Sequence, residues 1–433
     1  MKNSRYTALL PFGIFLTTFI ALNYIYHDAH IVKDNFPIFA AIIAIIASFF
    51  TFTKKETFNE KIEVFIQGCT QTMVIHMCYI FYVSTVFTAI LENTGGIAAA
   101  VTISLNFIPA WCIIPGLFLV SSLFSFTVGT SMGAIAAFMP IAITIAQQLA
   151  INPSLIAATI VCGAMFGDNL SILSDTTIAA VKITNSSMKE KLLLNTKIAA
   201  PAFFISLLCL VYQNCMITQN MTASITSINF IDFIKVIPYV LTFGLALTGL
   251  DILVVLVIGI GLALCMGIVF DQITCLQAIN ILFDGFYTNK SMVNVFILVS
   301  LLAGLSKIIT HNGGIAYLIR KLENKISNQT QARFAIFILI GAINATIAIN
   351  TISILIAGPI ANKIGNDCNL KPVQTACILD IGSCILQGIL PYAPQLLLAA
   401  SMAQVSTLSL LPYLYYQYAL TASLFIMIFF KKK

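Results

Sequence analysis

The chain has 433 residues, of which 59% are hydrophobic and only 9% are charged, and its formal net charge is +6. Soluble proteins carry about 25% charged residues, so this supply cannot build a water-facing surface, and neither a disordered chain nor a nucleic-acid-binding protein with a basic stripe fits the composition. We therefore expect an all-α polytopic membrane protein that is embedded in a lipid bilayer and binds no nucleic acid.

Eight apolar runs are long enough to cross the hydrocarbon core of a bilayer, which is about 30 Å thick and takes about 20 helical residues. They are 7–26, 36–53, 71–91, 196–212, 233–249, 252–270, 291–309 and 412–430. The first run follows Lys2 and Arg5 but has no small-residue cleavage site, so we interpret it as an uncleaved span and not as a signal peptide.

The positions of lysine and arginine predict the orientation of these spans, because short cytoplasmic loops carry the excess of both residues. With the amino terminus inside, all of them except Lys33, Lys235 and Lys290 fall on the cytoplasmic side. The cytoplasmic set includes Lys191, in a loop, and the lysine tail 431–433. We therefore expect both termini in the cytoplasm and no basic residue deep in the membrane.

The sequence contains no cluster of residues that indicates a metal site, a disulfide framework or an enzyme active site. The 11 cysteines are spread singly between Cys69 and Cys384, and the four histidines, including His27 and His30 in a polar loop, are too dispersed for a metal site. No nucleophile–base pair or phosphate-binding loop is visible. We expect neither a resident cofactor nor an enzyme.

Two further regions, 109–184 and 332–410, are apolar but interrupted by Gly, Pro, Asn, Ser and Thr at membrane depth. They resemble each other at a nearly constant offset in residue number, which pairs Gly95-Gly96 with Gly313-Gly314, Pro140 with Pro359 and Leu170 with Leu390. The predicted topology places the first glycine pair outside and the second inside, so the repeat is inverted. Inverted repeats whose discontinuous helices meet at the membrane midplane are typical of secondary transporters; chance recurrence in an apolar sequence is the alternative.

This repeat predicts how the chain is organised. We expect two N-terminal transmembrane helices in 1–60, the first inverted repeat in 61–212, a connecting loop and transmembrane helices in 213–290, the second inverted repeat in 291–410, and a C-terminal transmembrane helix with a cytoplasmic lysine tail in 411–433. Each repeat would supply one half of the transport machinery.

The first interruption, 128–133, and its counterpart, 348–353, predict a re-entrant hairpin or broken helix in each repeat. Irregular backbone is tolerated at membrane depth only inside protein or beside a wet cavity. The side-chain oxygens there belong to Thr130, Ser131, Asn350 and Thr351, and sodium, a hard cation, prefers oxygen ligands. A contact between helices through small residues is the alternative.

The second interruption, 167–177, concentrates polar side chains between two apolar runs. They are Asp168, Asn169, Ser171, Ser174, Asp175, Thr176 and Thr177. An ionised Asp at the centre of a span costs about 2.5–3.5 kcal/mol on insertion scales, so two acids here indicate a pathway for a cation or a proton. We expect an unwound segment in which Asp168 and Asp175, both shielded from solvent, bind Na⁺; a solvated surface loop that caps the next helix is the alternative.

The matching stretch of the second repeat, 387–395, has no carboxylate, but two prolines and a glycine break it and Gln387 supplies a neutral polar group. Asp380 is the only other acid that we place deep in the membrane. Asp380 and Gln387 are accessory candidates whose contacts the sequence leaves open. We expect His76 to be a buried, hydrogen-bonded histidine and Glu92 to be a carboxylate at the rim.

Two motifs resemble the signature of the NhaC-type Na⁺/H⁺ antiporters of the ion transporter superfamily. They are Gly129-Thr130-Ser131 followed by Pro140, and the more specific Gly167-Asp168-Asn169-Leu170-Ser171 followed by Ser174-Asp175-Thr176-Thr177. The resemblance covers about residues 60–410 and implies a bacterial inner-membrane exchanger of cytoplasmic Na⁺ for external H⁺, with a homodimer as one option for its assembly. Related members exchange organic anions or amino acids. Where relatives commonly have Pro between the two serines, this chain has Ile172-Leu173, which concerns the local backbone more than the ligands.

We therefore expect a sodium/proton antiporter in which Asp168 and Asp175 alternate between H⁺ and Na⁺. A sodium- or proton-coupled carrier of a small organic anion or amino acid is the alternative, against which the lack of deep basic residues argues weakly. A membrane scaffold that transports nothing would leave the paired intramembrane acids unexplained.

Overall fold

A computed structural model describes residues 6–25, 35–52, 56–107, 109, 112–218, 228–248, 250–270, 272–287, 289–323, 326 and 328–430. All regular secondary structure in these ranges is helical. The predictions made for Lys2, Arg5, His27, His30, Lys33 and the tail 431–433 concern residues outside the described ranges.

The first half of the chain forms a run of helices that begins with a short 3-10 helix. In order they are η1 (Tyr6–Leu9), α1 (Leu10–Ile25), α2 (Phe36–Ser48), α3 (Phe58–Cys69), α4 (Thr72–Asn93), α5 (Gly96–Phe107), α6 (Ile113–Val128), α7 (Ser131–Gln148), α8 (Pro153–Leu170), α9 (Asp175–Thr184) and α10 (Met188–Thr218). The breaks between α6 and α7 and between α8 and α9 fall at the two interruptions of the apolar sequence.

The second half repeats this order. Its helices are α11 (Phe230–Ala246), α12 (Ile252–Val269), α13 (Cys275–Tyr287), α14 (Lys290–His311), α15 (Gly314–Glu323), α16 (Gln329–Ile347), α17 (Asn350–Asp367), α18 (Pro372–Ile389), α19 (Pro394–Ala403), α20 (Thr407–Leu410), η4 (Leu411–Tyr413) and α21 (Tyr415–Phe430). Proline at the first position of α8, α18 and α19 suits a helix start, because its missing N–H would have no partner there.

Nine helical stretches of the described residues are long and apolar enough to cross a membrane, and the bent pair Thr407–Tyr413 and Tyr415–Phe430 adds a tenth. Over the described residues, most of each apolar run that the sequence marks as a span is helical, in one helix or, for 7–26 and 412–430, in a 3-10 helix and the α-helix that follows it. The prediction of an all-α polytopic membrane protein is therefore confirmed. α3 and α13 lie in segments where no span is predicted, and they pack against α14 and α4.

The two halves share their helix boundaries. α7 and α17, α8 and α18, and α9 and α19 all begin and end at one common offset in residue number, and α4 and α14 begin and end at an offset that is smaller by one. Residues with left-handed backbone (positive φ) also occur at equivalent positions of the two halves. The pairs are Gly95 and Gly313, Gly129 and Ala348, Ala150 and Asn369, and Asn185 and Gln404. The helix pairs α1–α2 and α11–α12, which lie outside the predicted repeat boundaries, also correspond.

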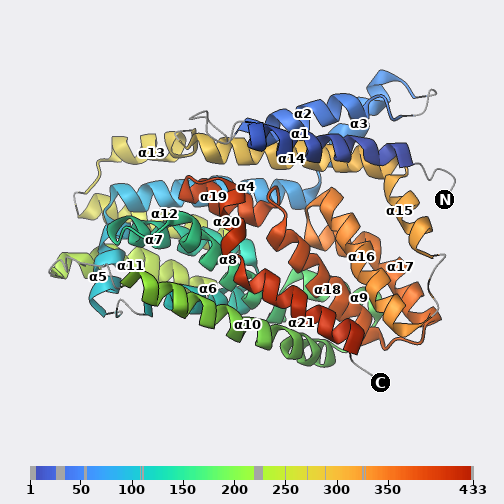
Figure 1. Cartoon of the computed structure of the whole chain (residues 1–433). Helices are drawn as coiled ribbons and strands as arrows, with labels where there is room; N and C mark the ends of the chain where they lie inside the picture. The colour runs from blue at the N-terminus through green and yellow to red at the C-terminus, as the bar shows by residue number, and fades with distance from the viewer. Residues whose placement is uncertain are drawn as a thin grey trace.

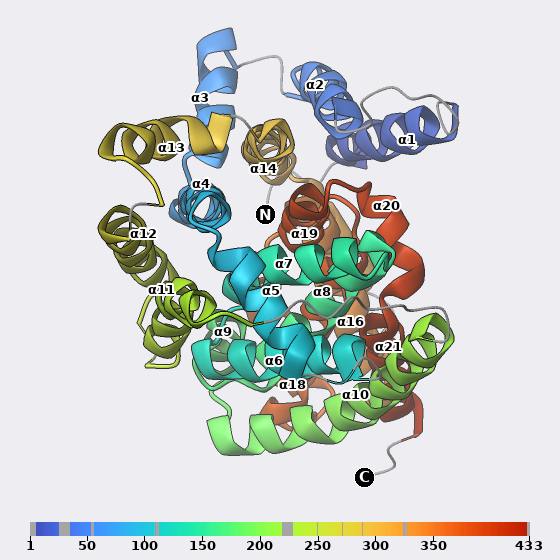
Figure 2. The ribbon, with the colours of Figure 1, turned by 90° about the vertical axis from the view of Figure 1, so that its left-hand side faces the viewer.

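The two repeats run in opposite directions through the molecule and cross at their breaks. α7 packs against α19 and α17 packs against α9, so each hairpin helix contacts the short helix behind the break of the other repeat. Figure 1 shows α7 and α19 toward the left and α9 and α17 toward the right. In Figure 2, α8, α16 and α18 lie inside a ring that includes α11 and α12 on one side and α1 and α2 on another. The predicted inverted repeat with broken helices is confirmed.

α8 is the most enclosed of the helices that carry a break, because α6 approaches it closely. A Cβ at Gly163 would lie 2.0 Å from Ser121 Oγ and 2.5 Å from Phe118 O. The approach allows Ser125 Oγ to donate to Ala164 O at 2.6 Å. Polar groups on α8 are thus withdrawn from lipid and depend on partners within the protein.

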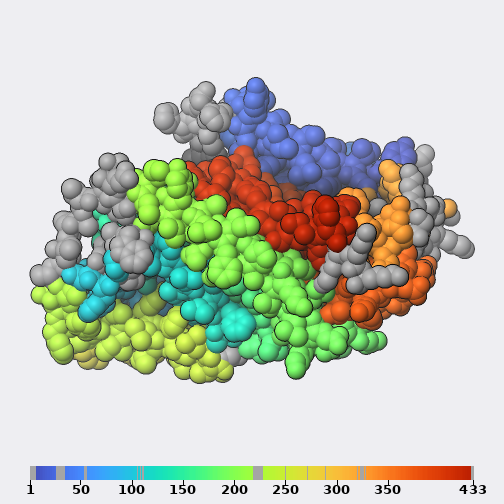
Figure 3. Space-filling view, turned by 60° about the horizontal axis from the view of Figure 1, so that its bottom comes forward, coloured from blue at the N-terminus to red at the C-terminus, as the bar shows by residue number. Residues whose placement is uncertain are grey.

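α10 and α21 are equivalent helices of the two repeats, and they lie side by side on the face seen in Figure 3, α10 in green and α21 in red. α10 is a single helix of 31 residues, whereas the corresponding part of the second repeat is bent by 58° between η4 and α21. The repeats therefore place different side chains at equivalent positions near the centre of the bundle.

Gly129 closes α6 in the left-handed conformation, with φ of 78°, and a Cβ there would lie 2.7 Å from the backbone of Leu173. We expect Gly129→Ala to lower the free energy of unfolding by about 1–3 kcal/mol, because an L residue is strained in this conformation and the contact is overpacked. Ala348, its equivalent, already has a Cβ and a φ of 57°, so Ala348→Gly should change stability by less than about 1 kcal/mol.

Unfolding of both variants in detergent micelles, followed by circular dichroism, measures the difference between the two positions. Equal losses of stability in Gly129→Ala and Ala348→Gly would contradict the close approach of the α8–α9 break to Gly129.

Candidate functional site

The break between α8 and α9 is held by side-chain hydroxyls. α8 ends at Leu170, residues 171–174 are extended or bent, and α9 begins at Asp175. Ser171 Oγ accepts a hydrogen bond from the backbone N–H of Leu173 at 3.2 Å, and the hydroxyls of Ser174 and Thr176 lie 2.9 Å apart. These local contacts replace the lost helical hydrogen bonds, so the predicted unwound segment is confirmed.

Asp168 lies in the last turn of α8, directly before this break, and is 5% exposed. The hydroxyls of Ser131, at the start of α7, and Ser174 lie beside its carboxyl group. Asp168 Oδ1 is buried and has no hydrogen-bond donor. A buried carboxylate with an unsatisfied oxygen is costly, which marks this position as one that a proton or a cation can fill.

Asp168 lines a cavity of about 290 Å³ that both repeats enclose. The cavity wall includes nine residues predicted for the ion site, which are Thr130, Ser131, Asp168, Ser174, Asp175, Thr176, Asn350, Thr351 and Gln387. The tips of the two hairpins therefore meet at one site. Carboxylate, hydroxyl and amide oxygens are the ligands that a hard cation prefers.

A chain of amides connects the two repeats across this wall. Gln387 Nε2 donates to Gln395 Oε1 at 2.7 Å, and Gln395 Nε2 donates to Ser131 Oγ at 3.3 Å. Asn350 Oδ1 accepts a hydrogen bond from Asn344 Nδ2 at 3.1 Å. Gln387, which is the equivalent of Asp168 in the second repeat, keeps Oε1 buried without a donor, so the second repeat contributes a neutral acceptor where the first contributes a charge.

The prediction that both aspartates are shielded from solvent is wrong for Asp175, which is exposed. Asp175 is the first residue of α9 and lies at the mouth of the cavity, where its carboxylate can interact favourably with the helix N-terminus and with water. The prediction of a buried, hydrogen-bonded His76 is wrong as well. Its side chain is 38% exposed and Nε2 lies 3.9 Å from Oδ2 of Asp251, which is also exposed.

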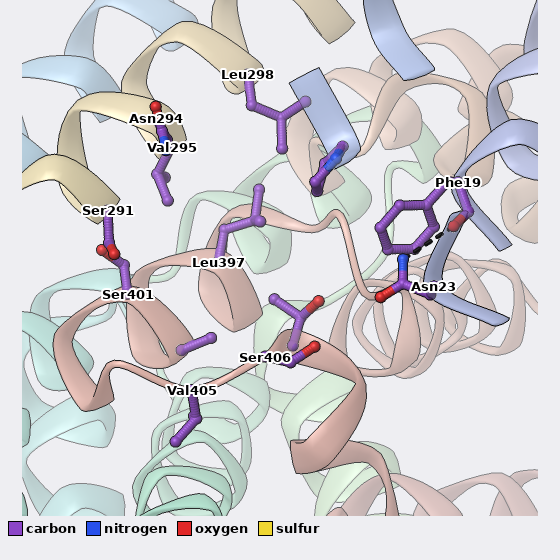
Figure 4. A pocket seen from close by; sticks show the side chains of 13 residues that line it. Phe19, Asn23, Ser291, Asn294, Val295, Leu298, Leu397, Ser401, Val405 and Ser406 are labelled. Atoms are coloured by element: carbon purple, nitrogen blue, oxygen red, sulfur yellow. Dashed lines mark hydrogen bonds between the residues drawn. The ribbon is translucent and has the colours of Figure 1, made fainter. Parts of the chain in front are cut away.

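Glu92 lies at the opposite end of α4, where it is exposed and lines a different cavity of about 440 Å³ together with Lys290. A third cavity, of only about 50 Å³, lies between α1, α14 and α19 (Figure 4). Its α14 wall, Ser291, Asn294, Val295 and Leu298, corresponds residue by residue to the α4 wall of the Asp168 cavity, Met73, His76, Met77 and Ile80. Equivalent places in the two repeats therefore hold a large cavity and a small one.

A buried ion pair lies beside the site and corrects two predictions. Lys191, predicted in a cytoplasmic loop, is fully buried on the first turns of α10 and contacts Asp380, which is equally buried. Lys191 Nζ also donates to Thr177 Oγ1 at 2.5 Å. The expectation of no deep basic residue is wrong, because α10 begins before the apolar run and carries Lys191 into the bundle, whereas Lys189 on the same helix is exposed.

Four predicted residues do not line the cavity. Ser171 holds the break, and Thr177 and Asp380 contact Lys191. Asn169 turns its amide toward Tyr416, to whose hydroxyl Nδ2 donates at 2.9 Å, while its backbone O accepts from Asn195 Nδ2 at 2.9 Å. The interruption thus divides into residues that face the cavity and residues that face the ion pair.

Lys191, Asn195 and Asp251 have contacts at or beside the site that were not predicted from the sequence, whereas Gln395 was expected to supply a neutral polar group together with Gln387. Lys191 and Asn195 are one helical turn apart, in register with the buried Ile198 and Ala202, so extending the helical period of α10 backward would have placed both on the inner face. Asp251 carries no comparable signal, because its carboxylate caps α12 by accepting from Leu253 N at 2.8 Å and reads as an ordinary helix start.

The Na⁺/H⁺ antiporter family matches the chain over residues 7–194 and 188–432. The malate-2H⁺/Na⁺-lactate antiporter of Bacillus subtilis is 21% identical over 345 residues, which cover 74% of each chain. An uncharacterized Na⁺/H⁺ antiporter of Haemophilus influenzae is 24% identical over 340 residues, 70% of this chain and 71% of that one. The Na⁺/H⁺ antiporter NhaC of Alkalihalophilus pseudofirmus is 22% identical over 331 residues, 71% of each. The solved YdaH transporter of Alcanivorax borkumensis is 13% identical, with a TM-score of 0.42 and 98% of both chains covered.

Asn195 joins the break to the ion pair, because Nδ2 donates both to Asn169 O and to Asp380 Oδ2, the latter at 2.8 Å. We expect Asn195→Leu to lower the free energy of unfolding by about 1–3 kcal/mol, since it keeps the volume but leaves buried acceptors without their donor. Thr196→Val, at the exposed neighbouring position, should stay within about 0.5 kcal/mol of the parent. Equal stability of the two variants in denaturant titrations would argue against this role of Asn195.

Proposed function

The chain belongs to the Na⁺/H⁺ antiporter family, a family of membrane transporters, and we propose that it exchanges sodium ions for protons at Asp168. Its resemblance to the NhaC-type antiporters is confirmed by the relative from Alkalihalophilus pseudofirmus. The observation that supports the proposal most directly is the buried Asp168 carboxyl group, which lines a polar cavity and has an oxygen without a donor.

Burial of Asp168 makes exchange obligatory in this proposal. A bare carboxylate withdrawn from water carries a large desolvation cost. In this proposal the protein therefore changes conformation only when Asp168 is neutralised by a bound proton or sodium ion. A proton satisfies Oδ1 by covalent attachment, and a sodium ion satisfies it by coordination. Because the two cations use the same oxygen, each displaces the other, and no separate coupling device is needed.

We propose that the oxygens around Asp168 complete the sodium shell. The hydroxyls of Ser131 and Ser174 lie beside the carboxyl group. Thr130 and Thr176 offer hydroxyls, and Asn350 and Gln387 amide oxygens, on the same cavity wall. Asp175 would act at the mouth as an attractive charge for entering cations and not as a ligand that remains bound, because it stays solvated in this state.

We also propose which side of the membrane the cavity serves. The distribution of lysine and arginine favours a cytoplasmic location for both termini and for the start of α4, and the resemblance to the NhaC-type antiporters favours the bacterial cytoplasmic membrane. The Asp168 cavity lies at the start of α4. Its counterpart at the start of α14 holds only about 50 Å³. Of these two equivalent cavities the cytoplasmic one is the larger, and the cavity of about 440 Å³ at the external end of α4 does not include Asp168, so we propose that Asp168 is open to the cytoplasm in this state of an alternating-access cycle.

A second candidate, a coupled carrier of small organic anions, is supported by the relative from Bacillus subtilis, which is a malate-2H⁺/Na⁺-lactate antiporter. A cavity of about 290 Å³ can hold a small organic acid. The two basic side chains near it both face carboxylates, since Lys191 contacts Asp380 and His76 Nε2 lies 3.9 Å from Asp251 Oδ2, which favours ions over anionic cargo. Uptake of labelled lactate, malate and amino acids in proteoliposomes separates the two candidates.

We expect Asp168→Asn to abolish sodium-dependent proton flux in everted vesicles, with sodium affinity reduced more than about a hundredfold, because losing one partner of a buried charge pair costs about 3–5 kcal/mol. Asp168→Glu should retain partial flux. Asp175→Asn should weaken sodium affinity less than about fivefold, since exposed charges contribute about 0–1 kcal/mol.

Asp367→Asn, at an exposed acid far from the cavity wall, is the matched control and should exchange normally. Full exchange by Asp168→Asn with sodium dependence unchanged would rule out Asp168 as the exchange site, whatever the cargo.

A further inference from the structure

The ion pair beside the cavity has no role in the exchange proposed for Asp168. Lys191 Nζ contacts Asp380 Oδ2, and both side chains are 0% exposed. Neither residue lines the cavity. The same carboxylate oxygen accepts from Asn195 Nδ2, and the ammonium also donates to Thr177. Two opposite charges are therefore enclosed in the bundle, one helix away from the proposed ion site.

The packing of the fold does not require these charges. By the offset that aligns α8 with α18, Lys191 corresponds to Leu410 and Asp380 corresponds to Val161, and both apolar residues are fully buried in equivalent places. Replacing a buried ion pair by apolar side chains is often neutral or even stabilising. The pair joins α10 of the first repeat to α18 of the second, whereas the pair related to it by the repeat, Leu410 and Val161, is apolar, so the packing of equivalent helices does not explain the charges.

The surroundings of Asp380 contain more acceptors than donors. Asp380 Oδ1, Asn195 Oδ1 and Asn169 Oδ1 are all buried and have no hydrogen-bond donor. Asn195 holds the three residues together, because its single Nδ2 group donates to Asn169 O and to Asp380 Oδ2. Carboxylate and amide oxygens are the ligands that hard cations prefer.

One of the titratable groups near the Asp380 carboxylate belongs to the cavity wall. Asp168 on α8 interacts with Asp380 on α18, and it also lines the cavity. Cys384 on α18 and Tyr416 on α21 are the other titratable side chains that interact with Asp380, while α9 contributes the Thr177 hydroxyl to Lys191. Asp380 and the cavity residue Asp168 are thus close enough to interact electrostatically, and protein surrounds both.

We propose that Asp380, Asn195 and Asn169 form a second site for a monovalent cation, and that the ammonium of Lys191 is the cation that occupies it in this state. An incoming sodium ion takes the place of the ammonium on the Asp380 carboxylate. Lys191 transfers one proton to water and remains as a neutral amine. One positive charge enters and one leaves, so the charge of the cluster is conserved. The site rests on the proposed function, because it adds a second exchange to that of Asp168.

The test counts sodium ions and protons on the purified full-length protein in lipid nanodiscs. Radioactive ²²Na⁺ measures sodium bound at saturation, and a pH indicator in weakly buffered solution measures protons released on adding NaCl. The double variant Lys191→Leu with Asp380→Val copies the equivalent apolar pair, Leu410 and Val161. We expect it to bind half the sodium of the parent and to release half the protons.

Two single variants and one control sharpen the result. Asp380→Asn should also lose half the bound sodium, whereas Lys191→Gln should bind the full amount but at lower pH, because sodium then competes with a proton on a carboxyl group and not on an amine. Lys197→Leu, at an exposed position of the same helix, should match the parent. Thermal unfolding of each variant verifies that it is folded.

The outcomes distinguish this site from the proposed function. Loss of sodium binding in Asp168→Asn with half retained supports both sites, and unchanged binding there refutes the role of Asp168. If the folded double variant or Asp380→Asn binds as much sodium and releases as many protons as the parent, the second site is refuted and Lys191 and Asp380 are a structural pair only.

Discussion

The arrangement of this protein depends on one constraint. A polar group that leaves water inside a membrane must find its partner within the protein, because lipid offers none. The chain interrupts its helices four times at depth, between α6 and α7, α8 and α9, α16 and α17, and α18 and α19. The polar groups at these breaks find partners because the repeats cross, so that breaks lie against helices of the other half, as where Gln395 Nε2 on α19 donates to Ser131 Oγ at 3.3 Å directly after the break between α6 and α7.

The same constraint explains why polar chemistry gathers at the centre. Breaks that are buried together bring their hydroxyls, amides and carboxylates together, and the Asp168 cavity is the result. At the position equivalent to Asp168, the second repeat has the neutral Gln387. A charged half and a dipolar half can enclose one cation between them, whereas two charged halves would repel each other at close range.

The residues proposed for function are buried polar side chains whose hydrogen bonding is incomplete. Buried acceptors are almost always paired in proteins, yet Asp168, Gln387, Asn169, Asn195 and Asp380 each keep an oxygen without a donor. Their common place near the crossing favours an ion over a defect of packing. The enclosed pair of Lys191 and Asp380 shows that an ammonium group inside the bundle is neutralised by a carboxylate, and a transported cation would need a partner of the same kind.

The sequence by itself determined the spans, the repeat and the breaks. Apolar length fixes where a chain crosses lipid, and Gly, Pro and clustered hydroxyls fix where a helix stops, so both are properties of consecutive residues. It also singled out Asp168, because an acid in a long apolar run has few explanations.

Only the tertiary structure decided which neighbours share a site. Asp175 follows Asp168 closely in the chain but lies on the far side of a break, so it faces the solvated mouth. Lys191 and Asp380 are far apart in the chain, and their contact depends on how α10 packs on α18. Packing in three dimensions decides the direction of a side chain after a break and the pairing of distant helices. Local sequence patterns contain no information about either.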